Sequence, residues 1–513
     1  MRILYYNWVD YLDEERRGGG VSVYQRNLMR ALAGEPGVEA SFLCSGVSYD
    51  FPRGGPPRWE PLRHGPNEDR ARRFEIINSA ALAPAHHGYG SAAQVSDTPT
   101  EEVFADFIAR TGPYDVIHFN TLEGLPAKVL ERCGAWPKMR VILSLHNYYP
   151  FCPQVNLWHQ EREICGDFDA GRKCVHCLPH VHDPRHMRLS GGLGYRLRLA
   201  GLTPGTWAFD QAYRWTMRIG GRGARLLRKL KGQGGVRRLR RGGKPGQLRP
   251  MAPPDGAPFA ARRAEIVRLI NDTCDAVLGV SDAVCRLAQG FGVTETLLHS
   301  SYIGTREAAA WHDTAPRIFP MASDGTLRLA YLGYMRRDKG FYFLLNALET
   351  MPPELASRLR LEVAAKRSDR ATMDRLSQLS GRLAGLTHAD GYSHDDLDRL
   401  LAEVDVGLIP VLWHDNLPQV AIEMHARHIP LLCADIGGAR ELGNCPQMTF
   451  AAGDVAAFHD RIRALLQGEI DMEAYWRGAS APVEMQAHLA DLMAHYRAGA
   501  EASGAPVIAG ETR

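Results

Sequence analysis

Two acidic residues, Asp415 and Glu423, are the first candidates for chemistry in this sequence of 513 residues. Seven residues separate them, in a stretch from 413 to 443 that otherwise has the composition of a protein core. Burying a carboxylate is unfavourable unless a polar group meets it. We therefore expect a polar partner at both acids, which ordinary core residues would not need.

Three cations follow another apolar run. Arg336, Arg337 and Lys339 come directly after residues 327–335. Cations at the carboxyl end of a strand suit a diphosphate, because open α/β sheets bind ligands at that edge. An ordinary solvated loop is the alternative interpretation.

Glycines and histidines at the ends of other runs could also contact a ligand. Gly19 and Gly20 lie between an apolar run and an amphipathic segment, where backbone N–H groups can reach a phosphate. A tight turn explains these glycines equally well. His146 ends the run "VILSLH" and gains a role if it faces a substrate, and His118 in "VIHFN" competes for that role.

Four cysteines form a separate group between residues 150 and 180. The C-x2-C pair and two earlier cysteines supply the four soft ligands of a tetrahedral zinc site. Reduced thiols, a disulfide and an iron–sulfur cluster are the alternatives. A structural zinc, the option that we favour, would fix the loop after His146. The four residues are Cys152, Cys165, Cys174 and Cys177, with His159 and His176 as replacement ligands.

Alternating apolar runs and helix-like segments must position these residues. The alternation predicts an α/β fold with two parallel sheets, in two domains that face each other across a cleft. Asn416 is expected to cap a helix whose first turn holds Pro418. The expected parts are a first domain over 1–313, a second over 314–480 and a C-terminal helix and tail over 481–513, with a linker over 304–326.

Residues 183–263 interrupt the first domain with a basic insert of 19 Lys or Arg and three Asp. The window 222–249 has eleven basic residues and no acid. Interleaved leucines and the upstream "FDQAYRWTMRI" favour amphipathic helices on an anionic membrane. Nucleic acid is the competing partner, but no nucleic-acid-binding module is visible.

Composition places further bounds on the chain. No apolar run approaches the roughly 20 residues that a membrane span needs. The first twenty residues have acids where a signal peptide has its apolar region. We therefore expect a cytoplasmic protein, peripheral on the inner membrane. Ten cysteines in such a chain favour thiols or metal ligands over disulfides.

Six segments together resemble the retaining family-four glycosyltransferases of the GT-B fold. They occur in that family's order and cover most of the chain outside the basic insert. The segments are GGGVSVYQRNLMRAL, YDVIHFNTLEGLP, SLHNYYPFCP, GVSDAV, GYMRRDKG and DNLPQVAIEMHARHIPLLCADIGGARELG. The resemblance implies two Rossmann-like domains, a nucleotide-sugar donor on the second, an acceptor on the first, and no metal in catalysis.

The resemblance also implies roles for single residues. Lys339 would bind the diphosphate, Glu423 the donor ribose and Asp415 the sugar, so that both acids would pair with donor hydroxyls rather than with protein. His146 would lie near the reacting sugar. The other implied donor-binding residues are Gly19, Gly20, Arg336, Arg337, Gly391, Tyr392, Asn416 and Leu417.

This sequence departs from the family at two positions. Asp415 stands where the family has the longer Glu, and Tyr334 stands where it has an arginine five residues before the lysine, so that Arg336 or Arg337 would substitute. The expected activity is that of a hexosyltransferase acting on a lipid-linked or polysaccharide acceptor. The alternatives are a nucleotide-sugar epimerase of the same fold and a non-catalytic protein that binds nucleic acid.

Overall fold

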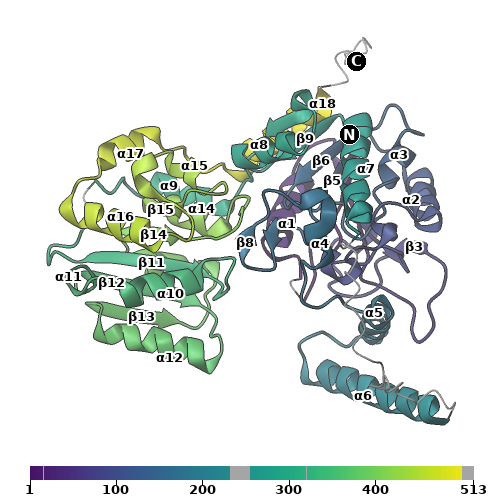
Figure 1. Ribbon diagram of the computed structural model, residues 1–513. Helices are drawn as coiled ribbons and strands as arrows, with labels where there is room; N and C mark the ends of the chain where they lie inside the picture. The colour runs from purple at the N-terminus through teal and green to yellow at the C-terminus, as the bar shows by residue number, and fades with distance from the viewer. Residues whose placement is uncertain (16, 231–254, 319–320, 499–513) are drawn as a thin grey trace, which may run out of the picture.

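The computed structural model describes residues 1–15, 17–230, 255–318 and 321–498. These residues form two α/β lobes, each built around one large sheet (Figure 1). The predicted pair of α/β domains with parallel sheets is therefore confirmed.

The sheet of the first domain has the strand order β10-β9-β6-β5-β1-β2-β4-β3. Its strands pair in parallel except β3, which runs antiparallel to β4 at the edge. Strands buried on both faces read as continuous apolar runs, and residues 3–6 are fully buried. The bounds are β1 Arg2–Tyr6, β2 Glu39–Ser45, β3 Arg58–Pro61, β4 Arg73–Ile77, β5 Val116–Phe119, β6 Arg140–Leu145, β9 Ala276–Gly279 and β10 Leu298–Ser300.

Helices cover this sheet, and a small hairpin of β7 (Trp158–His159) and β8 (Glu163–Ile164) follows β6. Helix α1 begins at Gly19, whose φ of +55° is accessible to glycine at little cost. The longer helices of this domain are α1 Gly19–Ala33, α2 Thr98–Thr111, α5 Pro184–Leu199, α6 Trp207–Leu230, α7 Ala257–Thr273 and α8 Asp282–Gly290; the shorter ones are α3 Val129–Cys133 and α4 Arg172–Val175.

The sheet of the second domain has the order β13-β12-β11-β14-β15-β16, all parallel. Its strands are β11 Leu327–Gly333, β12 Leu359–Ala365, β13 Gly385–Ala389, β14 Val406–Ile409, β15 Leu431–Ala434 and β16 Thr449–Phe450. Its helices are α9 Ala310–Asp313, α10 Phe341–Thr350, α11 Pro353–Ala356, α12 Arg370–Gln378, α13 Leu397–Leu401, α14 Gln419–His425, α15 Arg440–Gly443, α16 Val455–Gln467 and α17 Met472–Gly478.

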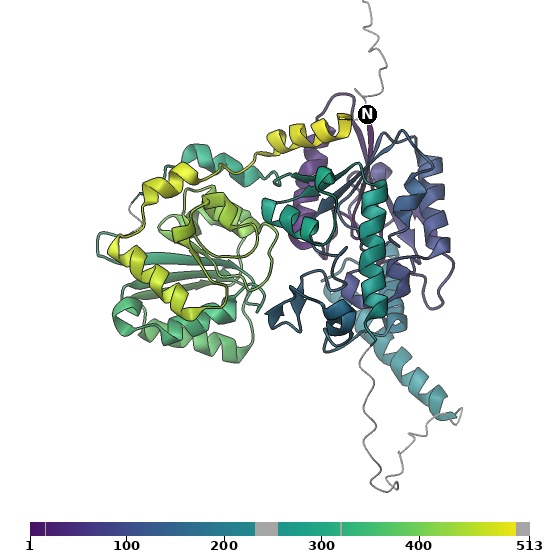
Figure 2. The same cartoon turned by 45° about the horizontal axis from the view of Figure 1, so that its top comes forward.

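The last described helix, α18 (Met485–Arg497), returns to the first domain (Figure 2). It packs against α1. The Tyr496 hydroxyl lies 2.6 Å from Nδ1 of His118, and Nε2 of His118 lies 2.7 Å from Ser144 Oγ. His118 is therefore a fully satisfied core residue, which removes it from competition with His146.

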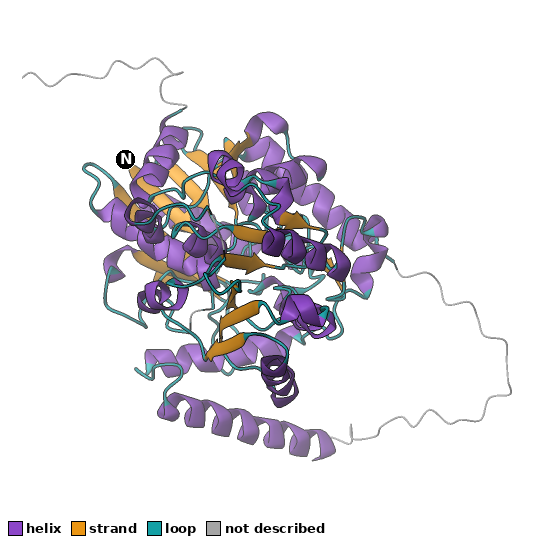
Figure 3. Cartoon of the chain, turned by 90° about the vertical axis from the view of Figure 1, so that its left-hand side faces the viewer, coloured by secondary structure: helices purple, strands orange, loops and turns teal. Residues whose placement is uncertain are grey.

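The basic insert divides between the body of the first domain and a projecting helix. Helix α5 packs on the domain, because Gly191 and Gly192 allow its backbone to approach residues 47–51. At the far end of the insert, Arg262 is buried and donates to the Gln94 side chain and the Tyr149 carbonyl. Helix α6 lies beside α5, away from both sheets (Figures 1 and 3). Residues 231–254, which include most of the acid-free window, lie outside the described residues.

The segment expected to be a plain linker has structure of its own. Residues 306–313 form a 3₁₀ turn and the short helix α9. The Trp311 ring stacks on His428 with centroids 3.9 Å apart, and His428 also lies against Trp476. No local sequence pattern predicts this packing, because the aromatic partners of Trp311 lie more than a hundred residues downstream. No helix in the described ranges is both long enough and apolar enough to cross a membrane.

Candidate active site

Lys339 and Asp415 meet at the carboxyl edge of the second sheet. Lys339 follows β11 and Asp415 follows β14, and these strands are paired in parallel. Gly340, with φ of +74°, approaches the end of β14 so closely that a Cβ atom would lie 1.7 Å from the Pro410 carbonyl oxygen. The two loops are thus packed together, and Lys339 Nζ donates to Asp415 Oδ2 at 2.5 Å.

Glu423 lies on α14 and is buried, with 5% of its surface exposed. The Tyr392 hydroxyl donates to its Oε2 at 3.2 Å, and His394 Nε2 lies 3.3 Å from its Oε1. The hydrogen bond to Glu423 raises the pKa of His394, whereas burial raises that of Tyr392. Each buried carboxylate thus has partners within the protein.

The fold itself therefore supplies partners for both acids, and their pairing with donor hydroxyls stays a prediction. The physical reason is the cost of burial: a carboxylate that loses its water needs charge or hydrogen bonds from the fold itself. Asp415 obtains them from Lys339, and Glu423 obtains them from Tyr392 and His394.

Three buried polar atoms beside this pair have no hydrogen-bond partner in the described part of the chain. They are Trp413 Nε1, Asn416 Oδ1 and the Tyr148 hydroxyl. Burial, followed by the nearby Asp415 carboxylate, raises the pKa of Tyr148, which keeps its phenol protonated and able to donate. Buried polar atoms are rarely left unpaired, so these three indicate the place of a polar ligand.

The cations after β11 differ in their exposure to solvent and in their acidic partners. Arg336 is held by the buried Asp338, to which its Nε donates at 2.9 Å, while Arg337 is exposed. Tyr334 is 58% exposed. Lys339 is the most buried of these cations, and its Nζ lies 5.1 Å from the centroid of the Trp413 ring. Lys339 is therefore the cation best placed beside the unpaired atoms.

His146 follows β6 in the first domain and is half-buried. Its Nε2 lies 3.0 Å from Asn120 Oδ1, and an amide oxygen only accepts, so Nε2 carries the proton and Nδ1 keeps its lone pair. Burial, with His488 as a second cause, lowers the pKa of His146 to about 3. The ring is therefore neutral at physiological pH and offers Nδ1 as a hydrogen-bond acceptor.

Gly20 lies at the contact between the domains, whereas Gly391 lies within the second domain. The Gly20 carbonyl accepts a hydrogen bond from Gln419 Nε2 at 3.0 Å, at the first residue of α14. Gly391, with φ of +82°, precedes Tyr392 in the loop after β13. The structure thus places the glycine turn of one domain next to the helix that carries Glu423 in the other.

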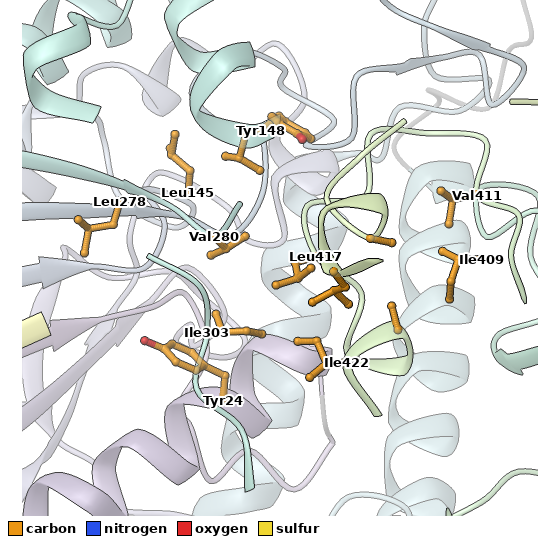
Figure 4. Packing of buried hydrophobic residues seen from close by; sticks show 14 of the residues in the cluster. Tyr24, Leu145, Tyr148, Leu278, Val280, Ile303, Ile409, Val411, Leu417 and Ile422 are labelled. Atoms are coloured by element: carbon orange, nitrogen blue, oxygen red, sulfur yellow. The ribbon is translucent and has the colours of Figure 1, made fainter. Parts of the chain in front are cut away.

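Asn416 and Leu417 belong to the same contact. Asn416 Nδ2 donates to the Leu145 carbonyl at 3.1 Å, and its own carbonyl accepts from Ser281 Oγ at 2.7 Å. Leu417 is buried in an apolar cluster with Leu145, Tyr148 and Val280 of the first domain (Figure 4). Asn416 therefore does not cap α14; Pro418 occupies the N-cap position, one residue later than expected, because the Asn416 side chain is engaged across the interface.

The four cysteines converge in one irregular segment of the first domain. Burial is the main cause that raises the pKa of Cys174, to about 12, and the thiols of Cys152, Cys177 and Cys165 contribute as neighbours. All four are free thiols. Within the described residues, however, no three of these sulfur atoms lie within 4.8 Å of one another. Cys177 Sγ instead donates to Gln154 Oε1 at 3.0 Å.

A separate cavity of about 390 Å³ lies in the first domain against α5. Polar residues of its lining include Asp50, Asn78 and Arg185. None of the donor-site candidates lines it. We therefore place the candidate site at Lys339 and Asp415, beside the unpaired buried atoms, together with Glu423 on the following helix.

Sequence reasoning missed three residues that the fold brings to the site: Tyr148, Trp413 and His394. Each stands two residues from a candidate that was found, namely His146, Asp415 and Tyr392. An aromatic residue with a polar atom, directly after a buried strand, was the signal that could have identified the first two.

Comparison with known proteins identifies a sequence family for part of the second domain. Residues 326–468 match the sequence model of a family described as glycosyl transferases group 1. This range contains Lys339, Asp415 and Glu423. No curated protein sequence matches the chain.

Solved structures show the fold of the whole chain. Sucrose-phosphate synthase from Thermosynechococcus elongatus is 15% identical with a TM-score of 0.52, and the match covers 98% of this chain and all of that one. The trehalose-phosphate synthase (UDP-forming) from Burkholderia vietnamiensis is 12% identical with a TM-score of 0.52, over 99% of both chains. The lipopolysaccharide outer core galactosyltransferase WaaB is 9% identical with a TM-score of 0.52, over 97% of this chain and all of that one.

The domain match and the shared fold support one conclusion. The chain is an enzyme of the glycosyltransferase type on the two-domain GT-B fold. Neither finding favours a nucleotide-sugar epimerase or a nucleic-acid-binding protein.

Proposed function

We propose that this glycosyltransferase is a retaining hexosyltransferase that moves a sugar from a nucleotide-sugar donor to a lipid-linked or polysaccharide acceptor. The observation that carries the proposal is the ion pair of Lys339 with Asp415 at the carboxyl ends of two paired parallel strands, beside three unpaired buried polar atoms. The buried Glu423 lies on α14, the helix that follows Asp415. Open α/β sheets bind their ligands at this edge.

Each residue has a distinct task in the proposed donor complex. Glu423 accepts hydrogen bonds from the ribose hydroxyls, with Tyr392 beside it. Lys339 turns its ammonium toward the diphosphate, and Arg336 or Arg337 adds positive charge at the mouth of the site. Asp415 shares its carboxylate between Lys339 and the sugar, and it accepts a hydrogen bond from a sugar hydroxyl.

The transfer step exchanges one bond at C1 of the sugar. The bond from C1 to the diphosphate oxygen breaks with both electrons leaving on the diphosphate, and the acceptor oxygen bonds to C1 on the same face. The acceptor proton passes to the departing diphosphate. Lys339 stabilises the charge that develops there, which is usually the largest single contribution to such catalysis. Neutral His146 accepts a hydrogen bond from the reacting sugar through Nδ1.

The acceptor is proposed to lie at a membrane because of α6. Trp207, Trp215 and Ile219 are 79%, 57% and 62% exposed. Their spacing of eight and four residues places them on one side of the helix. Arg214 and Arg218 are exposed beside them, and eleven basic residues follow in 222–249. Exposed apolar side chains with flanking cations suit the surface of an anionic bilayer at the inner membrane.

A structural zinc at Cys152, Cys165, Cys174 and Cys177 is part of the proposal. Its support is the convergence of the thiols and the strain of the segment that carries them. Six non-glycine residues between 155 and 170 have positive φ, including Val155 at +72°. Such residues adopt this conformation only when their surroundings enforce it. Zinc binding would require the sulfur atoms to move closer together.

Loss of one zinc equivalent in Cys174→Ser would support this site, whereas unchanged metal content would remove it.

The test of the donor site measures, by calorimetry, the affinity of wild type and Glu423→Ala for each member of a panel of nucleotide sugars. Wild type should bind one donor class. Glu423→Ala should bind the same donor about 10- to 100-fold more weakly, because a charged acceptor to buried hydroxyls contributes about 1.5–3 kcal/mol. Glu469→Ala, which removes an exposed acid of the same domain, is the matched control and should bind as wild type does. Equal affinity of wild type and Glu423→Ala would remove Glu423 from the donor site.

A further inference from the structure

Three histidines outside the candidate active site form a compact group. His86 and His87 lie in a 3₁₀ turn, Ala85–Gly88, and His182 directly precedes Asp183, the N-cap of α5. One ring nitrogen from each residue lies within 4.8 Å of the other two. In the described ranges, no other three residues among His, Cys, Asp and Glu meet this criterion. The ring centroids are 4.5 Å apart for His86 and His87, 5.0 Å for His87 and His182, and 5.8 Å for His86 and His182.

The three rings combine convergence with access from solvent. His87 is half-buried and His182 is exposed. Imidazole nitrogens that converge from three residues can offer their lone pairs to one metal ion.

We propose that His86, His87 and His182 bind one Zn²⁺ ion. Three imidazole nitrogens without a carboxylate suit zinc and its neighbours in the first transition row, whereas Mg²⁺ and Ca²⁺ need oxygen ligands. Nitrogens at the usual zinc distance lie roughly 3.4 Å from one another in a tetrahedral site. The present separations therefore close by rotation of the side chains.

The fourth position of the ion follows from the exposure of its ligands. His182 is exposed, so the fourth position of the ion faces solvent and takes a water molecule.

The position of the site predicts what the ion does. Its ligands come from two segments almost a hundred residues apart in the sequence, and α5 packs against the turn that holds His86 and His87. The ion therefore fixes the N-terminal end of α5, the helix that packs beside α6. This inference is independent of the proposed transfer reaction, because none of the three residues belongs to the candidate active site.

The experiment uses the full chain without a histidine tag, freed of metal by a chelator. Zn²⁺ is titrated in competition with a chromophoric chelator into wild type, His182→Ala and the pair His87→Ala with His182→Ala. Because His182 is exposed, its substitution should leave the fold intact. We expect zinc affinity at one site to fall more than about tenfold in both variants, since even loss of a group behind a ligand has effects of this size.

Two controls separate this site from its surroundings. His180→Ala and His186→Ala remove exposed histidines close to His182 in the sequence and should leave zinc affinity unchanged. In Cys174→Ser with Cys177→Ser, the ion held by histidines should remain. Co²⁺ then reports the ligands: the histidine site should give d–d bands without a thiolate charge-transfer band.

The proposal is overturned by either of two results. One is equal zinc affinity and stoichiometry in wild type and the His87–His182 pair variant. The other is a Co²⁺ spectrum in which every bound ion shows thiolate ligation and none persists in the cysteine variant.

Discussion

Lys339 is the residue on which the proposed chemistry depends most. In the folded chain its ammonium is bound by Asp415 and lies over the Trp413 ring. A diphosphate must therefore compete with one carboxylate for the same cation. The ion pair neutralises both charges before the donor binds. It also holds the ammonium at the edge of the sheet where the diphosphate is proposed to bind.

We predict that Lys339→Ala lowers kcat by more than about a hundredfold, because the variant loses charge stabilisation of the leaving diphosphate. Lys339→Arg should keep part of the activity, since it retains the charge but not the geometry. Steady-state kinetics with the identified donor decides this. Lys366→Ala, in the loop after β12, is the matched control, and normal turnover of Lys339→Ala would contradict the phosphate role.

His394 gives the site a pH dependence. Its hydrogen bond to Glu423 raises its pKa above the ordinary value of 6.5. A group whose pKa is raised by folding contributes stability that is fully present below its unfolded pKa and is lost as pH rises through its folded pKa. His394→Gln should therefore lower Tm relative to wild type below pH 6.5, and this difference should shrink as pH rises.

The measurement is a series of thermal unfolding curves over pH for both proteins. Tyr392→Phe is the control, because it removes the other hydrogen bond to Glu423 without removing a charge and should give a difference that is constant over this range. A His394→Gln difference that stays constant or grows with pH would show that the Glu423 contact does not govern the titration of His394.

At the scale of elements, α6 is a helix that leaves large apolar side chains exposed. Its Tyr213 hydroxyl pairs with the Ser190 hydroxyl of α5, and Phe209 stacks on Tyr213. Trp207, Trp215 and Ile219 are exposed. Large apolar side chains exposed together on one helix usually mark an interaction surface. The basic residues that follow favour an anionic lipid bilayer as the partner.

We predict that the protein binds vesicles of anionic lipid at low salt and that binding weakens as salt rises, because the attraction is screened within about one Debye length. Trp215→Ala with Ile219→Ala should reduce binding. A variant with Gln in place of Arg237, Arg238, Arg240 and Arg241, which lie outside the described residues, should also bind more weakly. Each cation near the surface contributes about 1 kcal/mol.

Sedimentation with vesicles is the measurement. Arg370→Gln with Arg399→Gln removes two exposed cations of the second domain and should leave binding unchanged. Equal sedimentation of wild type and both α6-region variants would contradict the membrane role, and so would tighter binding of wild type to nucleic acid than to anionic vesicles.

The elements also show which parts of the fold the sequence could predict. The buried central strands were predictable, since runs such as RVILSL are apolar on both faces. Strands β3 and β13 were not, because RWEP and GLTHA are short, partly polar and placed at sheet edges. The return of α18 to the first domain depends on the pairing of Tyr496 with His118 across the whole chain, which no local pattern reveals.

The same limit applies to the candidate site. The acids, the lysine and the glycine turns were found by residue type and spacing. The ion pair of Lys339 with Asp415 and the unpaired Trp413 Nε1 were not, because they depend on the close packing of the loops after β11 and β14 at Gly340. The histidine group joins segments that are distant in sequence, so its members gave no common signal.

At the scale of the molecule, direct hydrogen bonds join the two domains. Glu441 of the second domain accepts from the backbone N–H groups of Asp282 and Ala283 at the start of α8 in the first, at 3.0 and 2.7 Å. Asn416 bonds the end of β6. These contacts connect the end of β6, directly before His146, to the segment before α14, the helix that carries Glu423.

The most direct test of the central claim is transfer itself. The protein is incubated with the nucleotide sugar that it binds and with a lipid-linked acceptor, and released nucleoside diphosphate is quantified while NMR determines the anomeric configuration of the product. We predict release of one nucleoside diphosphate for each sugar transferred, with the donor's configuration retained, and loss of both in Lys339→Ala. An inverted product, or release that is equal in wild type and Lys339→Ala, would contradict the account.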